Sequence, residues 1–532
     1  GETLSLPAAA APAVLGTGGW SGPGRRALAD LARALAAAPE RIDAPPGLEG
    51  RLRDYQAEGV AWLRRTALLG TGGILADDMG LGKTVQVLAH VLDERARRRR
   101  ARGRRRAPMH PVLVVCPTSL VANWCAEAER FAPGLRLVHL QLPKAERERQ
   151  LDALGDADLI VTTYALLVRD LAFLEHQPFS LVVLDEAQAV KNPHGKAAQA
   201  ARRLDAERRL AITGTPIENH LGELWAQLDL VAPGFLGTPE RFGRRFRAPI
   251  ERRGEVEPLE TLRRRVAPLL LRRTRDAVLN ELPGKTETLR SVNLTGAQRA
   301  LYESLRLAQH ERVRRAVAER GLARSGIVVL DALLKLRQAC CDPRLVKLAS
   351  AQRVKGSAKL AELRALLATL IEEQRRVLVF SQFTEMLALI AEALTADGIA
   401  FETLTGDDPG RERKARIERF QNGAVPVFLI SLKAGGTGLN LTAADTVIHF
   451  DPWWNPAIEA QATGRAHRMG QRRPVHVYRL MASGTIEERI AALQARKAEL
   501  AASLLAPEGN GAKGIALDER ELEALFAPVE AG

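Results

Sequence analysis

The sequence predicts an α/β protein built from two doubly wound parallel sheets with helical insertions between them. Short Val/Ile/Leu runs such as "PVLVVC" and "LVVLDE" are each followed by a helical stretch, and continuous apolar runs are typical of parallel strands buried on both faces. This alternation stops near residue 217, where the sequence becomes mostly helical and rich in arginine, and it returns near residue 375. With 532 residues, the chain is also too long for a single hydrophobic core. The pattern therefore indicates two α/β lobes separated by a helical insertion.

Composition and periodicity divide the chain into five segments. They are a tail over residues 1–48 with a short helix around 25–38, a first lobe over 49–225, helical protrusions and a linker over 226–355, a second lobe over 356–484, and bracing helices over 485–532. The bracing helices are expected at 485–505 and 517–526. Residue 1 is Gly rather than Met, so the chain is either the C-terminal piece of a longer protein or carries an added residue.

The cysteines and apolar runs exclude several classes of protein. Cys116, Cys125, Cys340 and Cys341 form no C-x-x-C pair, and no Cys/His cluster has the spacing of zinc ligands. This usage fits a reducing cytoplasm. No apolar run reaches the roughly 18 residues that span a bilayer, and the Ala/Pro-rich start lacks the basic residues of a signal peptide. The sequence thus predicts a cytoplasmic protein without a membrane partner.

The stretch "GGILADDMGLGKT", which ends at Thr84, predicts a phosphate-binding loop. It joins a strand to a helix, and backbone N–H groups at a helix N-terminus bind phosphates. Lys83 would bind the β and γ phosphates, Thr84 would hold Mg²⁺, and Gly80 and Gly82 would allow close approach of the backbone. The generic loop has Gly where this chain has Asp77.

The stretch "LVVLDEAQ" predicts the acidic half of the same site. It is a buried strand that ends in Asp185 and Glu186, and ligands of parallel sheets bind at the carboxyl ends of strands. Asp185 suits Mg²⁺, which takes oxygen ligands, and Glu186 suits a base that orients the attacking water. The alternative is that both acids only cap the next helix. The phosphate loop earlier in the chain favours the nucleotide interpretation.

The second lobe contributes "QATGRAHRMGQ". Its Arg465 and Arg468 are three residues apart and would share one face of a helix. Two such arginines can clamp a transferring phosphoryl group. The alternative is a solvated arginine face.

The ordered set of motifs resembles the Swi/Snf family of superfamily-two, helicase-like ATPases, and specifically its bacterial members. The motifs run from "LRDYQAEG", "DDMGLGKT", "CPTSLVANW", "VTTYALL", "DEAQ" and "TGTPIEN" in the first lobe to "VLVFSQF", "SLKAGGTGLNLTAADTVIHFDPWWNPA" and "QATGRAHRMGQ" in the second. The family's own loop resembles "DDMGLGKT", which accounts for Asp77. Many relatives have DEAH where this chain has DEAQ, so Gln188 keeps a hydrogen-bonding side chain that cannot titrate.

The resemblance implies two RecA-like lobes that bind ATP and Mg²⁺, with Gln56 on the adenine. It implies that Lys83, Asp185, Glu186, Arg465 and Arg468 are catalytic. The nucleotide-binding set is then Gln56, Asp78, Met79, Gly80, Leu81, Gly82, Lys83, Thr84 and Gln461, with Thr84 and Asp185 holding Mg²⁺. Residues that would link ATP hydrolysis to DNA are Gln188, Thr213, Gly214 and Thr215.

The resemblance also implies that duplex DNA is bound across both lobes. The expected contacts are Thr118, Ser119, Thr162, Tyr164, Ser381, Gln382, Lys433, Gly435, Gly436 and Trp454. Small polar residues and glycines on strand-end loops suit phosphates and do not read bases. The alternative for each Ser or Thr is helix capping. Trp453 and Trp454 are DNA contacts or packing residues, and we favour packing for one of them. The arginines of "LLLRRTRD" at 269–276 are either solvated or a second DNA grip.

These features predict a monomeric motor that hydrolyses ATP in response to duplex DNA. It would move along the duplex without separating the strands and would displace bound proteins, with RNA polymerase or nucleoid proteins as candidate partners. It would be associated with the nucleoid. The alternatives are a true DNA or RNA helicase, and an ATP-dependent clamp or switch that does not translocate.

A basic run, "RARRRRARGRRR" at residues 95–106, supplies nine arginines of a formal net charge of +14. Such a charge indicates an anionic partner such as nucleic acid. The helix that follows Thr84 should carry the chain to the opposite edge of the sheet, away from the expected DNA path. Ala and Arg favour extension of that helix as a basic spur as far as Gly103. We favour a solvated surface loop over a DNA groove, with salt-sensitive electrostatic contacts as a secondary role.

Overall fold

The computed structural model describes residues 41–527 apart from several gaps, and the chain divides into two compact units. The gaps are residues 43, 103–109, 153, 218–219, 279–282, 322–323, 407, 409, 436–438, 454–455, 469 and 506–522. Unit 1 comprises Gly1–Asn280 with Leu500–Gly514, and unit 2 comprises Glu281–Glu499 with Ile515–Gly532. The helix expected around 25–38 and most of the one expected at 517–526 lie outside the described residues.

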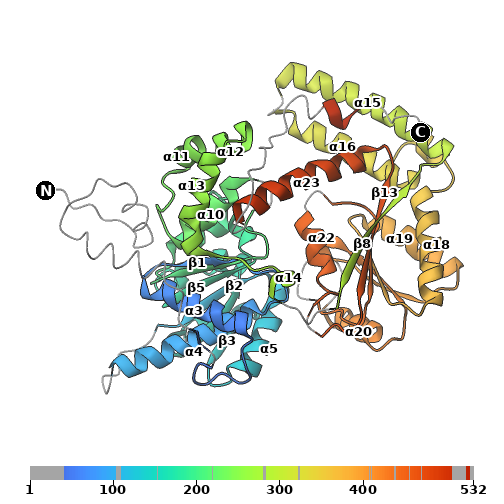
Figure 1. The fold of residues 1–532 in the computed structure, drawn as a ribbon. Coiled ribbons are helices and arrows are strands. Elements are labelled where there is room, and N and C mark those ends of the chain that lie inside the picture. Colours follow the sequence, from blue (N-terminus) through green and yellow to red (C-terminus); the bar gives the residue numbers. More distant parts are fainter. Residues whose placement is uncertain are drawn as a thin grey trace. The chain divides into compact units, whose positions relative to one another are not determined.

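Unit 1 contains a seven-stranded parallel sheet in the order β3-β4-β2-β5-β6-β1-β7 (Figure 1). The strands are β1 (Gly73–Leu75), β2 (Val112–Cys116), β3 (Leu137–His139), β4 (Leu159–Thr163), β5 (Leu181–Asp185), β6 (Arg209–Ile212) and β7 (Leu270–Leu271). Successive strand residues enter different cores: Ile74 packs in one, whereas Leu75 packs in the other. Both faces are therefore buried, as the continuous apolar runs predict.

Helices cover both faces of this sheet. One face packs against α3 (Asp54–Leu68), α4 (Lys83–Arg102) and α5 (Val121–Phe131). The other packs against α7 (Tyr164–Arg169), α9 (Lys196–Arg203), α10 (Leu221–Val231) and α13 (Val256–Val266). This doubly wound arrangement confirms the predicted fold class for the first lobe.

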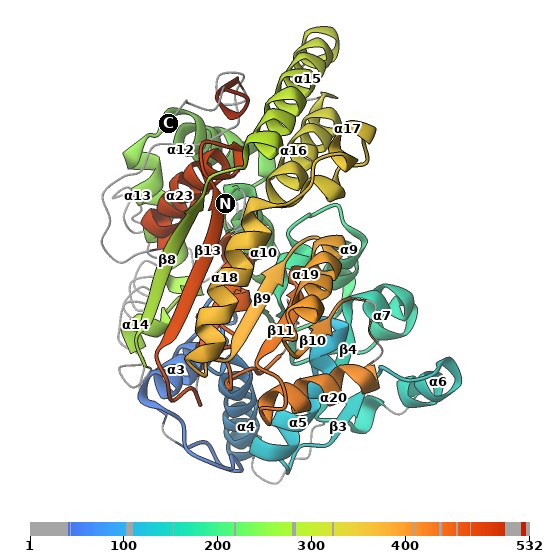
Figure 2. The same cartoon turned by 90° about the vertical axis from the view of Figure 1, so that its right-hand side faces the viewer.

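Unit 2 contains a six-stranded parallel sheet in the order β10-β11-β9-β12-β13-β8. The strands are β8 (Lys285–Val292), β9 (Val377–Ser381), β10 (Phe401–Leu404), β11 (Val427–Ser431), β12 (Thr446–His449) and β13 (Val475–Ala482). One face is covered by α18 (Ala358–Glu372) and α19 (Thr384–Ala396), which Figure 2 shows in front of the strands. The other face is covered by α20 (Gly410–Gln421) and α22 (Pro456–Thr463). The second lobe is thus doubly wound as well.

A separate helical core belongs to unit 2. It joins α15 (Gly296–Arg320) and α16 (Gly326–Cys341) to the beginning of α23 (Ile486–Leu505). Leu525 and Phe526, at the end of the described chain, are buried in the same core. The helix predicted at 485–505 is therefore present, and it packs on the helical protrusion.

The insertion between the lobes is mostly helical, but it also supplies β7 and β8. In β7, Leu270 and Leu271 pair with β1 and extend the sheet of unit 1. In β8, eight residues pair with β13 at the edge of the other sheet, and seven of the eight are exposed. Because the "KTETLRSV" sequence of β8 lacks an apolar run, it does not show the pattern of a buried strand.

The arginine run begins on α4, which continues to Arg102 as the extended-helix interpretation predicts. Arg95 pairs with Asp158 at 2.5 Å, and Arg98 pairs with Glu207 at 2.5 Å. These two arginines fix the second half of α4 to the segments that precede β4 and β6. This corrects the interpretation of the run as only a solvated loop. Arg99 and Arg100 are exposed, and residues 103–106 lie outside the described part of the chain.

Candidate nucleotide-binding and DNA-facing sites

The phosphate loop lies between β1 and α4, at the carboxyl edge of the first sheet. Gly80 and Gly82 have φ angles of 85° and 74°, which favour glycine. A Cβ at Gly82 would also lie 2.5 Å from Nε2 of Gln56. Lys83 begins α4, and its Nζ donates to the carbonyl oxygens of Asp77 at 2.6 Å and Asp78 at 3.3 Å. The Lys83 ammonium group therefore lies against the loop backbone, where a phosphate could replace the two carbonyl oxygens as its hydrogen-bond acceptor.

Asp77 is fully buried and organises the base of this loop. Its carboxylate accepts hydrogen bonds from Arg273 at 2.6 and 3.0 Å and from Nε2 of Gln86 at 3.2 Å. Arg273 also donates to Oε1 of Gln86 at 2.8 Å and to the backbone oxygen of Tyr55. The buried Asp77 thus anchors the half-buried Arg273 guanidinium, which explains an acid where the generic loop has Gly.

The role of Arg273 corrects the expectation for "LLLRRTRD". This arginine is neither solvated nor available as a DNA grip, because its guanidinium is engaged by Asp77 and Gln86. Packing around it is tight: a Cβ at Gly59 would lie 2.7 Å from its Nη2 and 1.9 Å from Oε1 of Gln86. The glycine of "LRDYQAEG" is therefore required where α3 meets this network.

Gln56 is buried against the loop. Its Nε2 donates to the backbone oxygen of Leu81 at 3.1 Å, and its Oε1 accepts from the backbone N–H of Arg53 at 3.0 Å. The side chain thus has a fixed position beside the loop, and its contact with adenine stays a prediction.

The two acids follow β5, at the same edge of the sheet. Asp185 accepts hydrogen bonds from Nε1 of Trp124 at 2.8 Å and from the backbone N–H of Glu186 at 2.9 Å. Burial, and after it the nearby Glu186 carboxylate, together raise the pKa of Asp185 to about 7. Glu186 has a φ of 51°, a left-handed conformation that is uncommon for Glu. A strained acid beside a buried acid is typical of a functional site.

A chain of hydrogen bonds runs from these acids to "TGTPIEN". Nε2 of Gln188 donates to Oε2 of Glu186 at 2.8 Å, and Oγ1 of Thr213 donates to Oε1 of Gln188 at 3.1 Å. The backbone N–H of Thr215 donates to Oγ1 of Thr213 at 3.0 Å. A Cβ at Gly214 would lie 3.5 Å from Cγ of Met79. Of the four residues expected to link hydrolysis to DNA, Gln188 therefore contacts the acid directly, Thr213 and Thr215 are connected to it through Gln188, and Gly214 lies near Met79 of the phosphate loop.

The predicted DNA contacts of unit 1 fall into two groups. Thr118 and Ser119 are exposed on a 3₁₀ turn directly after β2. Thr162 is fully buried in β4, so its side chain cannot reach DNA, and that prediction is corrected. The hydroxyl of Tyr164 donates to the backbone oxygen of Asp185 at 2.7 Å, and burial raises its pKa. Tyr164 therefore supports the acidic strand end.

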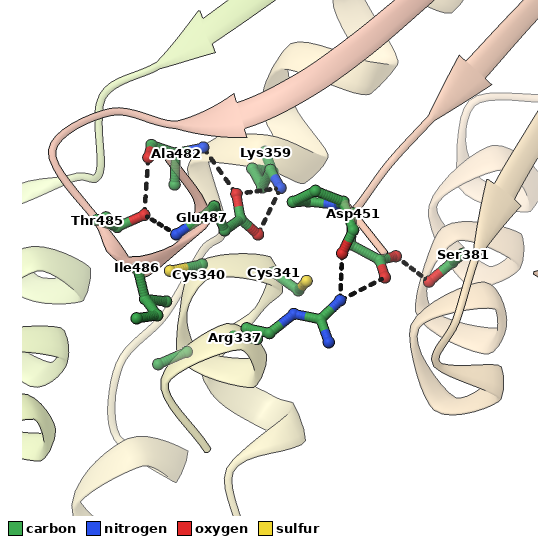
Figure 3. Close-up of polar contacts among 12 residues, drawn as sticks. Arg337, Cys340, Cys341, Lys359, Ser381, Asp451, Ala482, Thr485, Ile486 and Glu487 are labelled. Carbon is green, nitrogen blue, oxygen red and sulfur yellow. Dashed lines mark hydrogen bonds and ion pairs between the residues drawn. The ribbon is translucent and has the colours of Figure 1, made fainter. Parts of the chain in front are cut away.

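In unit 2, Ser381 is fully buried and its prediction as a DNA contact is also corrected. Its Oγ donates to Oδ1 of Asp451 at 2.5 Å (Figure 3). Asp451 also accepts from the backbone N–H of Gln382 and lies 3.9 Å from Arg337. The loop after β9 is thus tied to the end of β12. Gln382 is half-buried in that loop.

Figure 3 shows a second buried pair beside the Asp451 cluster. Nζ of Lys359, on α18, contacts both carboxylate oxygens of Glu487 at 2.9 and 2.8 Å. Glu487 lies in the first turn of α23 and also accepts from the backbone N–H of Ala482 at 2.8 Å. Both charged side chains are fully buried. This pair joins α18, α23 and the end of β13.

The remaining expected DNA contacts follow β11 and β12. Lys433 and Gly435 lie on the short helix Leu432–Gly435, directly after β11, whereas Gly436 and Trp454 lie outside the described residues. Trp453 packs against a core of unit 2, and its backbone N–H donates to Glu459 at 2.7 Å. This is the packing role favoured for one of the two tryptophans.

The structure also corrects the helical placement of Arg465 and Arg468. Helix α22 ends at Thr463, before Gly464, so the two arginines lie in a turn and do not share a helix face. Arg465 is buried, and its backbone oxygen accepts from the N–H of Leu441 at 3.1 Å. Arg468 is half-buried, and its Nη1 donates to the oxygen of Leu439 at 3.3 Å. Gln461 lies on α22.

Sequence reasoning missed Trp124 and Arg273 as parts of the nucleotide site. Trp124 lies in the motif "CPTSLVANW", which could have drawn attention to it. In the structure its indole N–H donates to the buried Asp185 carboxylate. Arg273 has no local signal, since its partner Asp77 is 196 positions away.

Together, two doubly wound sheets, a glycine-rich loop and a strand-end acid pair define a nucleotide-using protein of the helicase-like class. The family model for the SNF2-related domain matches residues 55–345, and the model for the helicase conserved C-terminal domain matches residues 358–470. The first match covers more than half of the chain. The chain therefore belongs to the SNF2 family of helicase-like ATPases, as its motifs predict.

Several known proteins are similar to this chain. An uncharacterized ATP-dependent helicase of Mycoplasma pneumoniae is 38% identical over 89% of this chain and 44% of its own length. The putative ATP-dependent helicase/translocase YwqA of Bacillus subtilis is 36% identical over 94% of this chain and 53% of its own length. The SWI2/SNF2 ATPase core of Sulfolobus solfataricus, solved with dsDNA, is 36% identical over 86% of this chain and 93% of that chain, with a TM-score of 0.44. The chain spans about half the length of these curated relatives.

The described residues contain neither a membrane-spanning helix nor a cluster of three metal-ligating side chains. Among the described residues, no helix is long and apolar enough to cross a membrane. Within the same part of the chain, no three His, Cys, Asp or Glu side chains gather as metal ligands. The four cysteines are free thiols, and all but Cys125 are buried.

Proposed function

We propose that this chain is an ATP-driven translocase on double-stranded DNA, which displaces bound proteins without separating the strands. The observation that carries the proposal is the hydrogen-bonded chain Glu186–Gln188–Thr213. It connects the acid suited to hydrolysis with the segment that passes beside the phosphate loop near Met79. Family membership supports the use of ATP, and the name of the Bacillus subtilis relative, helicase/translocase, supports movement on nucleic acid.

The residues of unit 1 fit an ATP–Mg²⁺ complex. Lys83 would exchange its two carbonyl partners for phosphate oxygens, which are stronger acceptors because they are charged. Thr84 and Asp185 would hold Mg²⁺, since the Asp185 carboxylate has lone pairs beyond the two that Trp124 and Glu186 use. When bound, Mg²⁺ would neutralise phosphate charge. Glu186 would orient the attacking water. The roles of Arg465, Arg468 and Gln461 stay predictions.

The candidate DNA contacts left by the structure are fewer than those predicted. Thr118 and Ser119 follow β2, Gln382 follows β9, and Lys433 and Gly435 follow β11. All stand at the carboxyl ends of parallel strands, where hydroxyl, amide and N–H groups suit contacts to backbone phosphates. RNA polymerase and nucleoid proteins remain the proposed targets of displacement.

The first test compares ATP turnover with duplex DNA, single-stranded DNA and RNA at one salt concentration. We expect duplex DNA to raise turnover most, and equal rates with and without nucleic acid would support the clamp alternative. Glu186→Gln should retain ATP binding and lower turnover by about 10²–10⁴-fold. Glu146→Gln, on the exposed surface of unit 1, makes the same charge change and should match the wild type.

The second test addresses the hydrogen-bonded chain itself. Gln188→Leu removes the link between Glu186 and Thr213, so basal turnover should persist while stimulation by duplex DNA falls. Gln188→His keeps a hydrogen-bonding ring and should preserve stimulation. Equal stimulation of Gln188→Leu and the wild type would contradict the assigned link.

A true helicase is the second candidate, because the name of the Mycoplasma relative is ATP-dependent helicase. A translocase removes the third strand of a DNA triplex and leaves the duplex paired. A helicase instead separates the two strands of a forked duplex. ATP-dependent separation of the fork by this chain would reject the translocase.

A further inference from the structure

A cavity of about 550 Å³ opens in unit 2 at the edge where its strands begin. Its walls are the segments that enter β9, β11, β12 and β13. Because the strands are parallel, this edge is opposite the one that carries Gln382 and Lys433. The cavity is therefore distinct from the proposed DNA-facing edge of the same sheet.

Four arginines line this cavity: Arg375, Arg376, Arg472 and Arg473. The described residues that line it contribute no carboxylate. Asp445, fully buried behind the wall, lies 3.2 Å from Nη1 of Arg473 and 4.0 Å from Nη1 of Arg375. Glu373, which does not line the cavity, also lies 3.7 Å from Nε of Arg375. Two carboxylates thus neighbour four guanidiniums, and the net charge around the cavity is positive.

The arginines differ in how they are held. Nη1 of Arg376 donates to the backbone oxygen of Gln421 at 3.1 Å. Its guanidinium lies over Gly423, where an added Cβ would be only 2.2 Å from Nη2. Arg472 is exposed, and its guanidinium makes no hydrogen bond or ion pair with the residues that the structure describes. The site thus combines a fixed guanidinium with one that can move onto a ligand.

Size and charge together identify the ligand class. A volume of about 550 Å³ is within the range of small-molecule pockets. A guanidinium pairs with phosphate through two parallel hydrogen bonds. A concave site also suits a compact anion better than a rigid duplex, whose phosphates lie on a convex surface. We propose that this cavity binds a free polyphosphate-bearing small molecule, of the size of a nucleoside di- or triphosphate.

The floor of the cavity is hydrogen-bonded to the turn that holds Arg465. Nε2 of Gln471 donates to the backbone oxygens of Ala444 at 2.7 Å and Ala466 at 3.1 Å. Ala466 directly follows Arg465, whose own backbone oxygen accepts from Leu441. A ligand in the cavity would therefore affect the position of the turn that carries Arg465, through Gln471. This effect on ATP turnover rests on the proposed function, whereas binding at the cavity does not.

Calorimetric titration with sodium tripolyphosphate tests the site, because this anion carries no base or sugar. Lys83→Ala impairs the phosphate loop of unit 1, so the binding that remains should arise in unit 2. In that background, Arg472→Gln should weaken binding by about tenfold, the loss of one charge-assisted contact. Gln374→Glu, which adds a negative charge at the exposed rim with almost no change of shape, should weaken it as well.

Arg353→Gln is the matched control, since Arg353 is an exposed arginine of unit 2 outside the cavity. It should bind tripolyphosphate like its Lys83→Ala parent. Unchanged affinity in both Arg472→Gln and Gln374→Glu, with unchanged melting temperatures, would overturn the proposal. Loss of all binding in Lys83→Ala would also overturn it.

A competition titration separates a free polyphosphate from the backbone of nucleic acid. If duplex DNA displaces tripolyphosphate, and Arg472→Gln weakens both ligands equally, the cavity is part of a nucleic-acid surface and the proposal is wrong. Failure of DNA to stimulate turnover would contradict the proposed function alone, because the titration does not depend on hydrolysis.

Discussion

The phosphate loop depends on a residue far outside its own motif. Asp77 reads as a departure from the generic loop, yet it is buried and paired with Arg273, 196 positions later. Sequence patterns report local periodicity and spacing, so a partner at that distance gives no signal. The same limit explains Thr162 and Ser381. Their residue type suits DNA, but their places on buried strands turn the hydroxyls inward.

Arg273→Gln should therefore destabilise unit 1 and weaken ATP binding together. Removal of the guanidinium leaves the Asp77 carboxylate buried without its main partner, which costs about 3–5 kcal/mol. Denaturant unfolding and nucleotide titration measure the two effects. Asp77→Asn combined with Arg273→Gln should recover part of the stability, because no buried charge is then left. Arg252→Gln, on the exposed surface of unit 1, should change neither property.

At the level of elements, α18 and α23 are joined by a buried ion pair. Lys359 and Glu487 are both fully buried, and the carboxylate is shared with the backbone N–H of Ala482. The first turn of α23 is thus fixed to the sheet of unit 2 at the end of β13. From the sequence, the helix at 485–505 was predictable from its apolar period, but this partner was not.

Lys359→Met should lower the free energy of unfolding by about 3–5 kcal/mol, because Glu487 is left as an unpaired buried charge. The double variant Lys359→Met with Glu487→Gln should recover much of this loss. Urea unfolding of both variants provides the measurement. If the double variant is no more stable than the single one, the unpaired Glu487 carboxylate is not the cause of the lost unfolding free energy.

Helix α4 separates structural from solvated arginines within one run. Arg98 pairs with both Glu94 and Glu207, and its hydrogen bond to Glu207 raises its pKa, whereas Arg99 and Arg100 are exposed. Arg98→Gln should lower stability by about 1 kcal/mol, the scale of a partly exposed ion pair.

Arg99→Gln with Arg100→Gln should leave the melting temperature unchanged. Any loss of DNA affinity should appear only at low salt, because exposed charges are screened as the salt concentration rises. Fluorescence anisotropy with labelled duplex at two salt concentrations checks this. A loss of maximal DNA-stimulated turnover in the double variant would instead place the run on the DNA path.

At the scale of the whole molecule, the sequence predicted the elements that carry regular patterns. Two doubly wound sheets, the phosphate loop before α4 and the acids after β5 all follow from apolar runs and their strand-end residues. The polar edge strand β8 was not predictable from apolar runs, because seven of its eight residues are exposed and none forms a buried run. The turn that carries Arg465 and Arg468 was also not predicted. Their spacing suggested a helix, but the helix ends before Gly464.

Both units bury a neutral histidine, and this gives the molecule a common response to acid. Burial lowers the pKa of His90 in unit 1 to about 4 and that of His449 in unit 2 to about 3, with Arg479 as a second cause for His449. An unfolded histidine has a pKa of about 6.5. Below that pH the two histidines bind protons in the unfolded chain but stay neutral in the folded chain. The free energy of unfolding should therefore fall as the pH drops from about 6.5 towards 4, by up to about 1.4 kcal/mol per pH unit for each histidine.

His449→Gln tests this directly. The variant loses the stacked contact with Phe380, whose ring centroid is 5.8 Å away, so it should be less stable than the wild type at pH 7.5. Because Gln does not titrate, its stability should decline less steeply between pH 6.5 and 4, and the two curves should converge in acid. His194→Gln, which replaces an exposed histidine, should keep the slope of the wild type. Urea unfolding over this pH range measures all three slopes, and a slope of His449→Gln equal to that of the wild type would show that His449 already accepts a proton in the folded protein.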